Sequence, residues 1–304
     1  MDLILNHIIS FTKAKSIDSY LKKWKKAGFV VGKKTVRHEP GLRNGFVYFG
    51  PEYIEFSWVE DETLFQKEAK AYQKSIRHNP SPYGIAFESS DVNVLHRRLR
   101  RAGYNVPETY SKGPRDADAS VIWWSFQSIP FRYLPGAWTF ALTYELRKNQ
   151  RKARKLTIGR NTLFAVAGLT FVTKYPRQRV STWKKFLATS TLKKITTDRY
   201  QLIFGPHRLE WMTPNAYEEE YGLKIEMRRG HQEIRELTLI HLFAESLLKA
   251  KLILRKNKFN VRSDKDRLLI GPQKNDGFCF SVTEKKVKNW LQERSQFGQR
   301  FTLK

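Results

Sequence analysis

The sequence predicts an α+β fold built from four βαβββ modules that are arranged as two pairs. Three observations support this prediction. Strand-like and helix-like patterns alternate twice within the first 145 residues, a turn motif from the first half recurs in the second, and the chain has 304 residues with 40% hydrophobic side chains. A chain of this length and composition is long enough for two domains, each with its own packed core.

The first module is expected between residues 3 and 59. Residues 3–11 are apolar and rich in β-branched side chains, which indicates a strand. Residues 16–27 carry apolar side chains at helical spacing, and Gly28 is placed to end that helix. Three further strands are expected at 29–36, 44–50 and 53–59, separated by Pro-Gly and Gly-Pro turns.

The same order begins again after a polar, helix-like stretch from Glu62 to Arg77. Residues 83–88 predict a strand, and Asp91 is a suitable N-cap for the helix that follows. That helix is expected to end at Ala102-Gly103, as the first one ends at Ala27-Gly28. Residues 121–126 and 138–146 supply later strands.

An internal repeat extends this organisation to the second half. Residues 49–56, Phe-Gly-Pro-Glu-Tyr-Ile-Glu-Phe, match residues 204–211, Phe-Gly-Pro-His-Arg-Leu-Glu-Trp. We therefore expect a first module pair at 1–146, a basic linker at 147–160, and a second, degenerate pair with a C-terminal helix at 161–304. The linker run could bind phosphates, although a solvated connection between domains is the favoured interpretation.

The charge balance is the strongest compositional signal. Lys and Arg number 56 against 29 Asp and Glu, a net charge of +27. Such a surface attracts acidic small molecules or nucleic acid; clustering of the cations would favour nucleic acid. The single cysteine, Cys279, fits a reducing compartment and is expected in a strand core. With no signal peptide and no membrane-length apolar run, we expect a cytoplasmic protein without membrane contact.

Common catalytic motifs are missing from the sequence. It contains no Gly-rich phosphate loop, HExxH helix, paired CxxC or nucleophile elbow. One constellation remains: His7 lies in the first strand of the first module, and Glu55 lies in its last strand.

These residues carry a resemblance to a known family. Residues 5–9, residues 53–56 and the loop at 38–45 resemble the glyoxalase-like branch of the vicinal oxygen chelate superfamily. The resemblance implies that paired modules form a curved mixed sheet around a cleft, with metal ligands on the first and last strands of a module. By position, His7 and Glu55 would be metal ligands. An imidazole and a carboxylate suit one divalent ion such as zinc, iron, nickel or manganese.

The sequence also departs from the family pattern. Gly84 and Gly168 stand where His7 stands in the first module, although Glu210 matches Glu55. In the fourth module, Glu236 or His241 is the candidate. Without a metal, Glu55 would be a general base, with His38 as a second catalytic candidate. Substrate contacts are expected from Arg43, Asn44, Trp124 and Trp138, although strand tryptophans are more often core residues.

These observations favour a protein that binds a small, anionic, oxygen-rich molecule in the cleft of the first pair and catalyses an isomerase- or lyase-type reaction there. Two alternatives remain open. One is a non-catalytic module that sequesters a small molecule, and the other is a basic nucleic-acid-binding protein, which is less favoured. A pair of modules within one chain completes a cleft, so both a monomer and a homodimer are compatible with the sequence.

Overall fold

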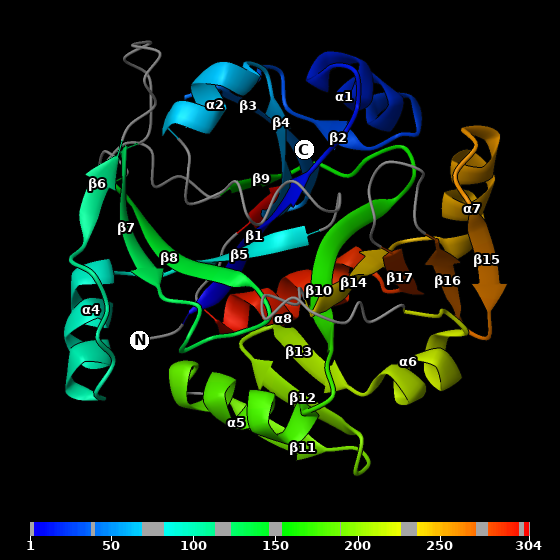
Figure 1. Cartoon of the computed structure of the whole chain (residues 1–304). Helices are drawn as coiled ribbons and strands as arrows, with labels where there is room; N and C mark the ends of the chain where they lie inside the picture. Colours follow the sequence, from blue (N-terminus) through cyan, green and yellow to red (C-terminus); the bar gives the residue numbers. More distant parts are fainter. Residues whose placement is uncertain are drawn as a thin grey trace.

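The computed structural model describes residues 3–37, 40–68, 82–112, 123–145, 154–188, 190–225, 236–271, 279–297 and 301–303. Within them, most strands fall into two eight-stranded sheets, and a further two-stranded sheet joins β9 to β18. The helices α1, α4, α5 and α7 lie around the outside, with the strands between them (Figure 1). This arrangement confirms the predicted α+β fold of four modules in two pairs.

The first sheet has the strand order β2-β3-β4-β1-β5-β8-β7-β6. Because β1 and β5 pair side by side at its centre, the two modules form one continuous surface. The elements of this pair are β1 (Ile4–Phe11), α1 (Ile17–Lys26), β2 (Val30–Val31), β3 (Leu42–Phe49), β4 (Glu52–Val59), α2 (Glu62–Glu68), β5 (Pro82–Glu88), α4 (Val92–Arg101), β6 (Tyr110–Lys112), β7 (Trp123–Ile129) and β8 (Trp138–Glu145).

The second sheet repeats this order, as β11-β12-β13-β10-β14-β17-β16-β15. Its elements are β10 (Leu163–Val172), α5 (Pro176–Phe186), β11 (Thr191–Lys194), β12 (Arg199–Phe204), β13 (His207–Met212), α6 (Pro214–Tyr221), β14 (Leu237–Ala244), α7 (Leu247–Lys256), β15 (Val261–Asp264), β16 (Arg267–Ile270) and β17 (Cys279–Glu284). Ala244 thus ends a strand, and the helix of the fourth module begins at Leu247.

Local signals explain where the helices begin and end. The hydroxyl of Ser16 accepts from the backbone N–H of Ser19 at 3.2 Å, and Asp91 accepts from Asn93 N at 2.7 Å. These side chains satisfy N–H groups that the first helical turn leaves without partners. After α1, the chain turns at Gly28, whose φ of +85° lies in the left-handed region that favours glycine. The N-cap at Asp91 and the end of α1 before Gly28 agree with the sequence prediction.

The segment expected as a linker takes part in a small sheet with the C-terminus. Strand β9 (Arg154–Leu156) pairs in parallel with β18 (Phe301–Leu303), and helix α8 (Val287–Gln296) comes before β18. Leu156 is buried with Phe164, Val287 and Trp290. The chain between the two pairs is therefore packed against the C-terminal helix at this point.

One large apolar core joins the two pairs on their helix-covered sides. Trp24 of α1 contacts Phe280 of β17, with ring centroids 6.1 Å apart. Phe87 of β5 contacts Trp183 and Phe186 of α5 at 6.2 and 5.8 Å. Among the described residues, no helix is long and apolar enough to cross a membrane.

Candidate functional site

The inner face of the first sheet is the side opposite α1. Along β1 and β4, alternate residues point to opposite sides, so Ile8 and Phe56 pack with the helices while His7 and Glu55 point to the inner face. In the parallel register, His7 lies beside Tyr53, and Ile9 lies beside Glu55. His7 Nε2 and Glu55 Oε2 are 3.5 Å apart, and both residues are buried. The structure thus brings together the two residues proposed as metal ligands.

The imidazole of His7 is oriented by Asn6. Asn6 donates from Nδ2 to Glu88 Oε2 at 3.0 Å, so its Oδ1 faces His7 Nδ1 at 2.7 Å and accepts from it. Tyr144 also donates to this oxygen, at 3.1 Å. A neutral His7 therefore carries its proton on Nδ1 and turns the lone pair of Nε2 towards the Glu55 carboxylate. Two acceptors facing each other in this way attract a cation, either a proton or a metal ion.

Asn44 holds the other oxygen of Glu55. Its Nδ2 donates to Glu55 Oε1 and to Ser57 Oγ, the second bond being 3.1 Å long. Asn44 is one of the predicted substrate-binding residues, and β3 places it beside Ser57 on the neighbouring strand. Its Oδ1 is buried and has no hydrogen-bond partner among the described residues. A buried carbonyl oxygen without a partner is costly, which makes it a candidate ligand atom.

Aromatic side chains surround the pair. Tyr53 stacks on the His7 ring at 4.5 Å, and Phe140 meets the same ring edge-on at 5.6 Å. Trp138 lies 4.7 Å from Phe140, and Trp124 packs against the same cluster. Burial, together with Tyr144 and Glu55, raises the pKa of Tyr53 well above its usual value, so its phenol stays protonated.

Arg43, one of the predicted substrate-binding residues, is turned away from this site. Arg43 follows the opposite alternation from Asn44, and its guanidinium pairs with Glu60 at 2.7 Å and with Asp18 at 3.8 Å. His38 lies outside the described residues. The substrate contact expected from Arg43 is therefore not present in the described geometry.

Sequence reasoning missed the residues that orient His7. Strict alternation would point Asn6 and His7 to opposite faces of β1. The pairing of β1 with β5 shifts register between Leu5 and His7, which brings the two side chains together. Tyr53 and Tyr144, whose hydroxyls are 3.4 Å apart, come from strands β4 and β8. The one available signal was that Tyr53 stands two residues before Glu55 and so shares its face.

The inner face of the second sheet has the same register but different side chains. Gly168 lies beside Arg208, and Thr170 lies beside Glu210, as His7 and Ile9 lie beside Tyr53 and Glu55. Gly168 therefore does occupy the position of His7, as the repeat predicted. His241 of β14 lies beside Gly168 and contributes to this face.

Glu236, the other candidate of the fourth module, lies beside α5. It is buried, pairs with Arg179 at 2.8 Å, and its backbone N–H donates to Gly136 O at 3.0 Å. Burial raises the pKa of the Glu236 carboxyl above its usual value, although Arg179 opposes the change. Cys279 is buried in β17, and burial raises the pKa of its thiol to about 12, which leaves it unreactive as a nucleophile.

Metal ligands are few in the described part of the chain. No group of three or more His, Cys, Asp or Glu side chains is arranged to hold an ion there. The first inner face offers His7 Nε2, the Glu55 carboxylate and the carbonyl oxygen of Asn44. This set of nitrogen and oxygen donors suits a borderline or hard divalent cation.

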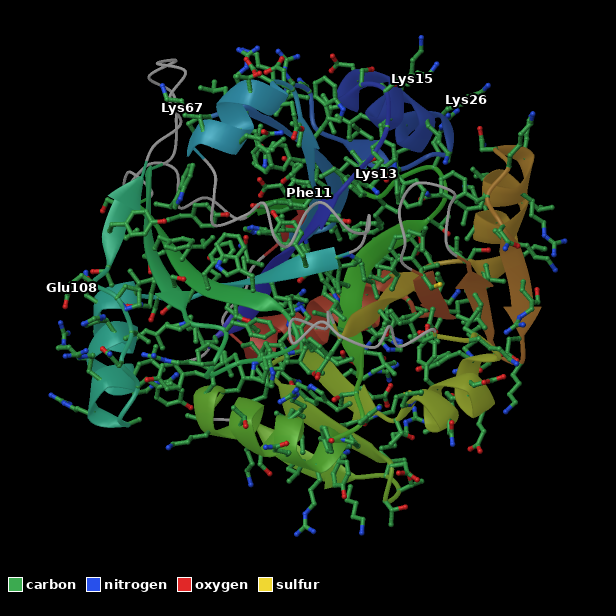
Figure 2. All side chains as sticks on the ribbon, viewed as in Figure 1. Phe11, Lys13, Lys15, Lys26, Lys67 and Glu108 are labelled. Atoms are coloured by element: carbon green, nitrogen blue, oxygen red, sulfur yellow. The ribbon has the colours of Figure 1, made fainter. Side chains whose placement is uncertain are left out.

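The cationic side chains are spread over the molecule. Helices α1, α4, α5 and α7 all carry Lys or Arg in their last turn. In Figure 2, nitrogen-tipped side chains project on every side of the view, with Lys15, Lys26 and Lys67 among those labelled.

The chain resembles a known protein family and several solved structures. Residues 5–187 match the model of a glyoxalase-like domain. No curated protein sequence matches the chain. Among solved structures, a hypothetical protein from Staphylococcus aureus is similar with a TM-score of 0.64 and 12% identity, covering 93% of this chain and 100% of the other.

Two similar structures are enzymes. The Mn(II)-bound glyoxalase from Novosphingobium aromaticivorans has a TM-score of 0.57 at 10% identity, covering 100% of this chain and 88% of that one. The 2,2',3-trihydroxybiphenyl 1,2-dioxygenase from Sphingomonas wittichii has a TM-score of 0.52 at 12% identity, covering 95% and 94%. At such low identities the likeness shows the fold alone, which is the vicinal oxygen chelate fold.

Proposed function

The chain belongs to the glyoxalase-like domain family, and from this premise we propose that its first module pair binds a small, oxygen-rich molecule on the inner face and catalyses an isomerase- or lyase-type reaction there. The observation that carries the proposal is the buried pair of His7 Nε2 and Glu55 Oε2, 3.5 Å apart. Buried titratable groups that converge on one face are a common feature of catalytic sites.

A divalent ion of zinc, iron, nickel or manganese would be held by His7 and Glu55, with Asn44 Oδ1 as a further ligand. The residues fit such an ion because His7 is oriented by Asn6 in the tautomer that leaves Nε2 available. When bound, the ion would supply positive charge that polarises adjacent oxygens of the substrate.

In this proposal, side chains of the protein take up the proton of the substrate and return it. Glu55 is the base of this proposal, and Asn44 keeps its carboxylate turned towards His7. Tyr53, Phe140 and Trp138 form the apolar surroundings that exclude water. An anionic ligand fits best with a cation present, because Glu55 already contributes a carboxylate beside His7.

Metal analysis of the purified protein tests this proposal. We expect stoichiometric divalent metal in the wild type, and its loss in the H7A/E55A double variant. A matched control is available: His96 Nε2 and Glu108 Oε2 are also 3.5 Å apart, but Glu108 is exposed on the surface. The H96A/E108A variant should keep its metal. Equal metal content in all three proteins would overturn the metal-assisted form of the proposal.

The aromatic cluster favours a second candidate, non-catalytic binding of an apolar or aromatic molecule. Tyr83 and Trp138 stack with planes 3° apart, and Phe126 and Phe140 lie 4.6 Å apart on the same face. A binder of this kind would keep its ligand affinity in the H7A/E55A variant and would show no turnover in the wild type. An enzyme would lose turnover in that variant.

A further inference from the structure

The second inner face contains an arginine whose charge has no partner in the described part of the chain. Arg208 of β13 occupies the position that Tyr53 has in the first sheet. The aliphatic carbons of its side chain pass over Gly168. A Cβ atom at Gly168 would come within 2.5 Å of Arg208 Cγ and 2.3 Å of its carbonyl oxygen. The glycine that replaces the histidine therefore makes room for the arginine to cross the sheet towards β14.

The neighbouring carboxylate, Glu210, is fully engaged by other donors. Arg199 Nε and Gln201 Nε2 each donate to its Oε1 at 2.7 Å. Thr170 and Tyr221 donate to Oε2 at 3.1 and 3.3 Å. Arg199 occupies the position of Asn44 in the repeat. Arg199 pairs with Met212, and Asn44 pairs with Ser57, the residue equivalent to Met212. Glu210 is thus neutralised by Arg199 and is not the counter-charge of Arg208.

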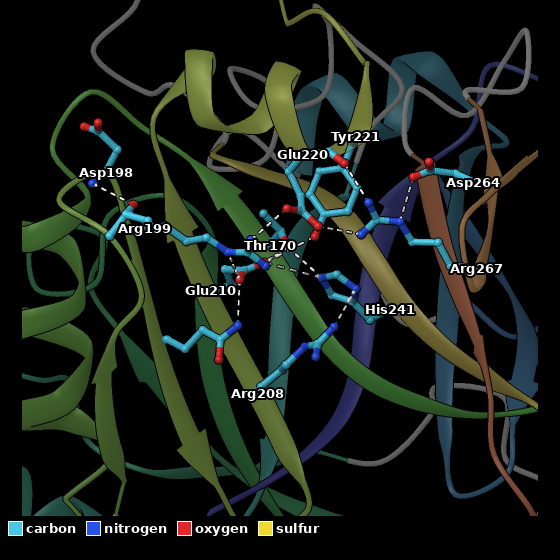
Figure 3. A network of polar contacts seen from close by, with 12 residues as sticks. Thr170, Asp198, Arg199, Arg208, Glu210, Glu220, Tyr221, His241, Asp264 and Arg267 are labelled. Atoms are coloured by element: carbon cyan, nitrogen blue, oxygen red, sulfur yellow. Dashed lines mark hydrogen bonds and ion pairs between the residues drawn. The ribbon is translucent and has the colours of Figure 1, made fainter.

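The hydrogen bonds that link these residues have a defined direction (Figure 3). The single proton of the Thr170 hydroxyl goes to Glu210, so Thr170 must accept from His241 Nε2, 2.7 Å away. His241 Nδ1 is then unprotonated and accepts from Arg208 Nη2 at 3.2 Å. This pattern requires a neutral His241. Burial, together with Arg208, Arg199 and Arg267, lowers its pKa well below the usual value, in agreement.

The other arginines nearby each have carboxylate partners of their own. Arg267 pairs with Glu220 at 2.7 Å and with Asp264 at 2.9 Å, and Arg199 also contacts Glu220 at 2.9 Å. Arg208 has no carboxylate within 4.0 Å among the described residues, and its Nε is buried without a hydrogen-bond partner. Arg208 is half-buried, and a partly desolvated guanidinium with unused donors is stabilised when an anion meets it.

We propose that Arg208 is the anchor of an oxyanion site on the inner face of the second module pair, which takes the carboxylate or phosphate group of a small molecule. The planar guanidinium keeps the N–H groups that His241 does not use for a bidentate contact, while His241 holds Nη2 in place. The site is independent of His7 and Glu55. It gives the second pair a binding role of its own.

Calorimetric titration of the full-length protein with inorganic phosphate and with malonate tests the site. We expect the R208Q variant to bind the preferred anion about tenfold more weakly, the loss of one charge-assisted hydrogen bond. The surface variant K184Q/K185Q removes two positive charges on α5, one more than R208Q does, and should bind as the wild type does. The H7A/E55A variant should also bind normally, which separates this site from that of the first pair.

Three results would overturn the proposal: no anion binding by the wild type, equal binding by R208Q, or a loss that is as large in K184Q/K185Q. If R208Q does not fold, R208K provides the second test, because lysine keeps the charge but loses the fork. We expect R208K to bind several-fold more weakly than the wild type, and undiminished affinity would contradict the bidentate contact. Preference for malonate or for phosphate then identifies which oxyanion the site takes.

Discussion

Glu52 and His207 occupy the same position in the two copies of the Phe-Gly-Pro turn, and they meet each other where the two module pairs join. His207 Nε2 lies 3.1 Å from Glu52 Oε1, and both side chains are fully buried. Arg294 of α8 also pairs with Glu52 Oε1, and the backbone N–H of Val166 donates to Oε2 at 3.2 Å. One carboxylate therefore connects the first pair, the second pair and the C-terminal helix.

Removal of this carboxylate should destabilise the whole protein. We expect E52A to lower the free energy of unfolding by about 3–5 kcal/mol, because Arg294, which is fully buried, would lose its ion pair with Glu52. Denaturant unfolding followed by circular dichroism measures the change. The control is E293A on the same helix, which breaks the more exposed Lys285–Glu293 pair and should cost about 1 kcal/mol or less. Similar losses for both variants would contradict the role given to Glu52.

His207 should make stability depend on pH. Burial lowers its pKa from 6.5 to about 3, so the folded protein keeps it neutral while the unfolded chain takes up a proton below about pH 6.5. Its contribution to stability is therefore present above pH 6.5 and is lost as the pH falls towards 3. We expect the wild type to lose stability between pH 7 and pH 5, and H207Q to lose less over the same interval. An unchanged slope in H207Q would show that His207 is not responsible.

Gly168 should not tolerate a side chain. A methyl group there meets the carbonyl and the stem of Arg208, so G168A should destabilise the protein by about 1–3 kcal/mol and weaken anion binding at Arg208. The control is G32A, since the nearest atom to a Cβ at Gly32 is 3.4 Å away. Thermal unfolding with and without phosphate measures both effects. A G168A variant as stable as G32A would contradict the packing described.

Nucleic-acid binding, if measured with a labelled oligonucleotide, should be sequence-independent and should disappear between about 50 and 200 mM salt. The reason is that the Lys and Arg side chains are distributed over several outer helices. Fluorescence polarisation across a salt series provides the measurement. Tight, sequence-selective binding that survives 200 mM salt would favour the nucleic-acid hypothesis over the one proposed.

The sequence predicted the modules well because their signals are local. Helix caps, Gly-Pro turns and alternating apolar residues depend on near neighbours, and the repeat around Gly50 and Gly205 made the pairing visible. The meeting of His7 and Glu55 also followed from the resemblance. Its supporting residues did not, because the contact between Asn6 and His7 depends on a register shift between β1 and β5. Arg43, by contrast, could have been placed from the sequence. It precedes Asn44 in β3, so the two side chains point to opposite faces of the sheet, and Arg43 pairs with Glu60 away from the site.

The central claim is that His7 and Glu55 form a metal-dependent site for a small molecule. Its most direct test is a crystal of the protein grown with Mn²⁺ or Zn²⁺, with diffraction recorded on both sides of the metal's absorption edge. We expect an anomalous peak about 2.0–2.2 Å from His7 Nε2 and from a Glu55 oxygen. A direct hydrogen bond between His7 and Glu55, with no peak beside them at saturating metal, would contradict the claim.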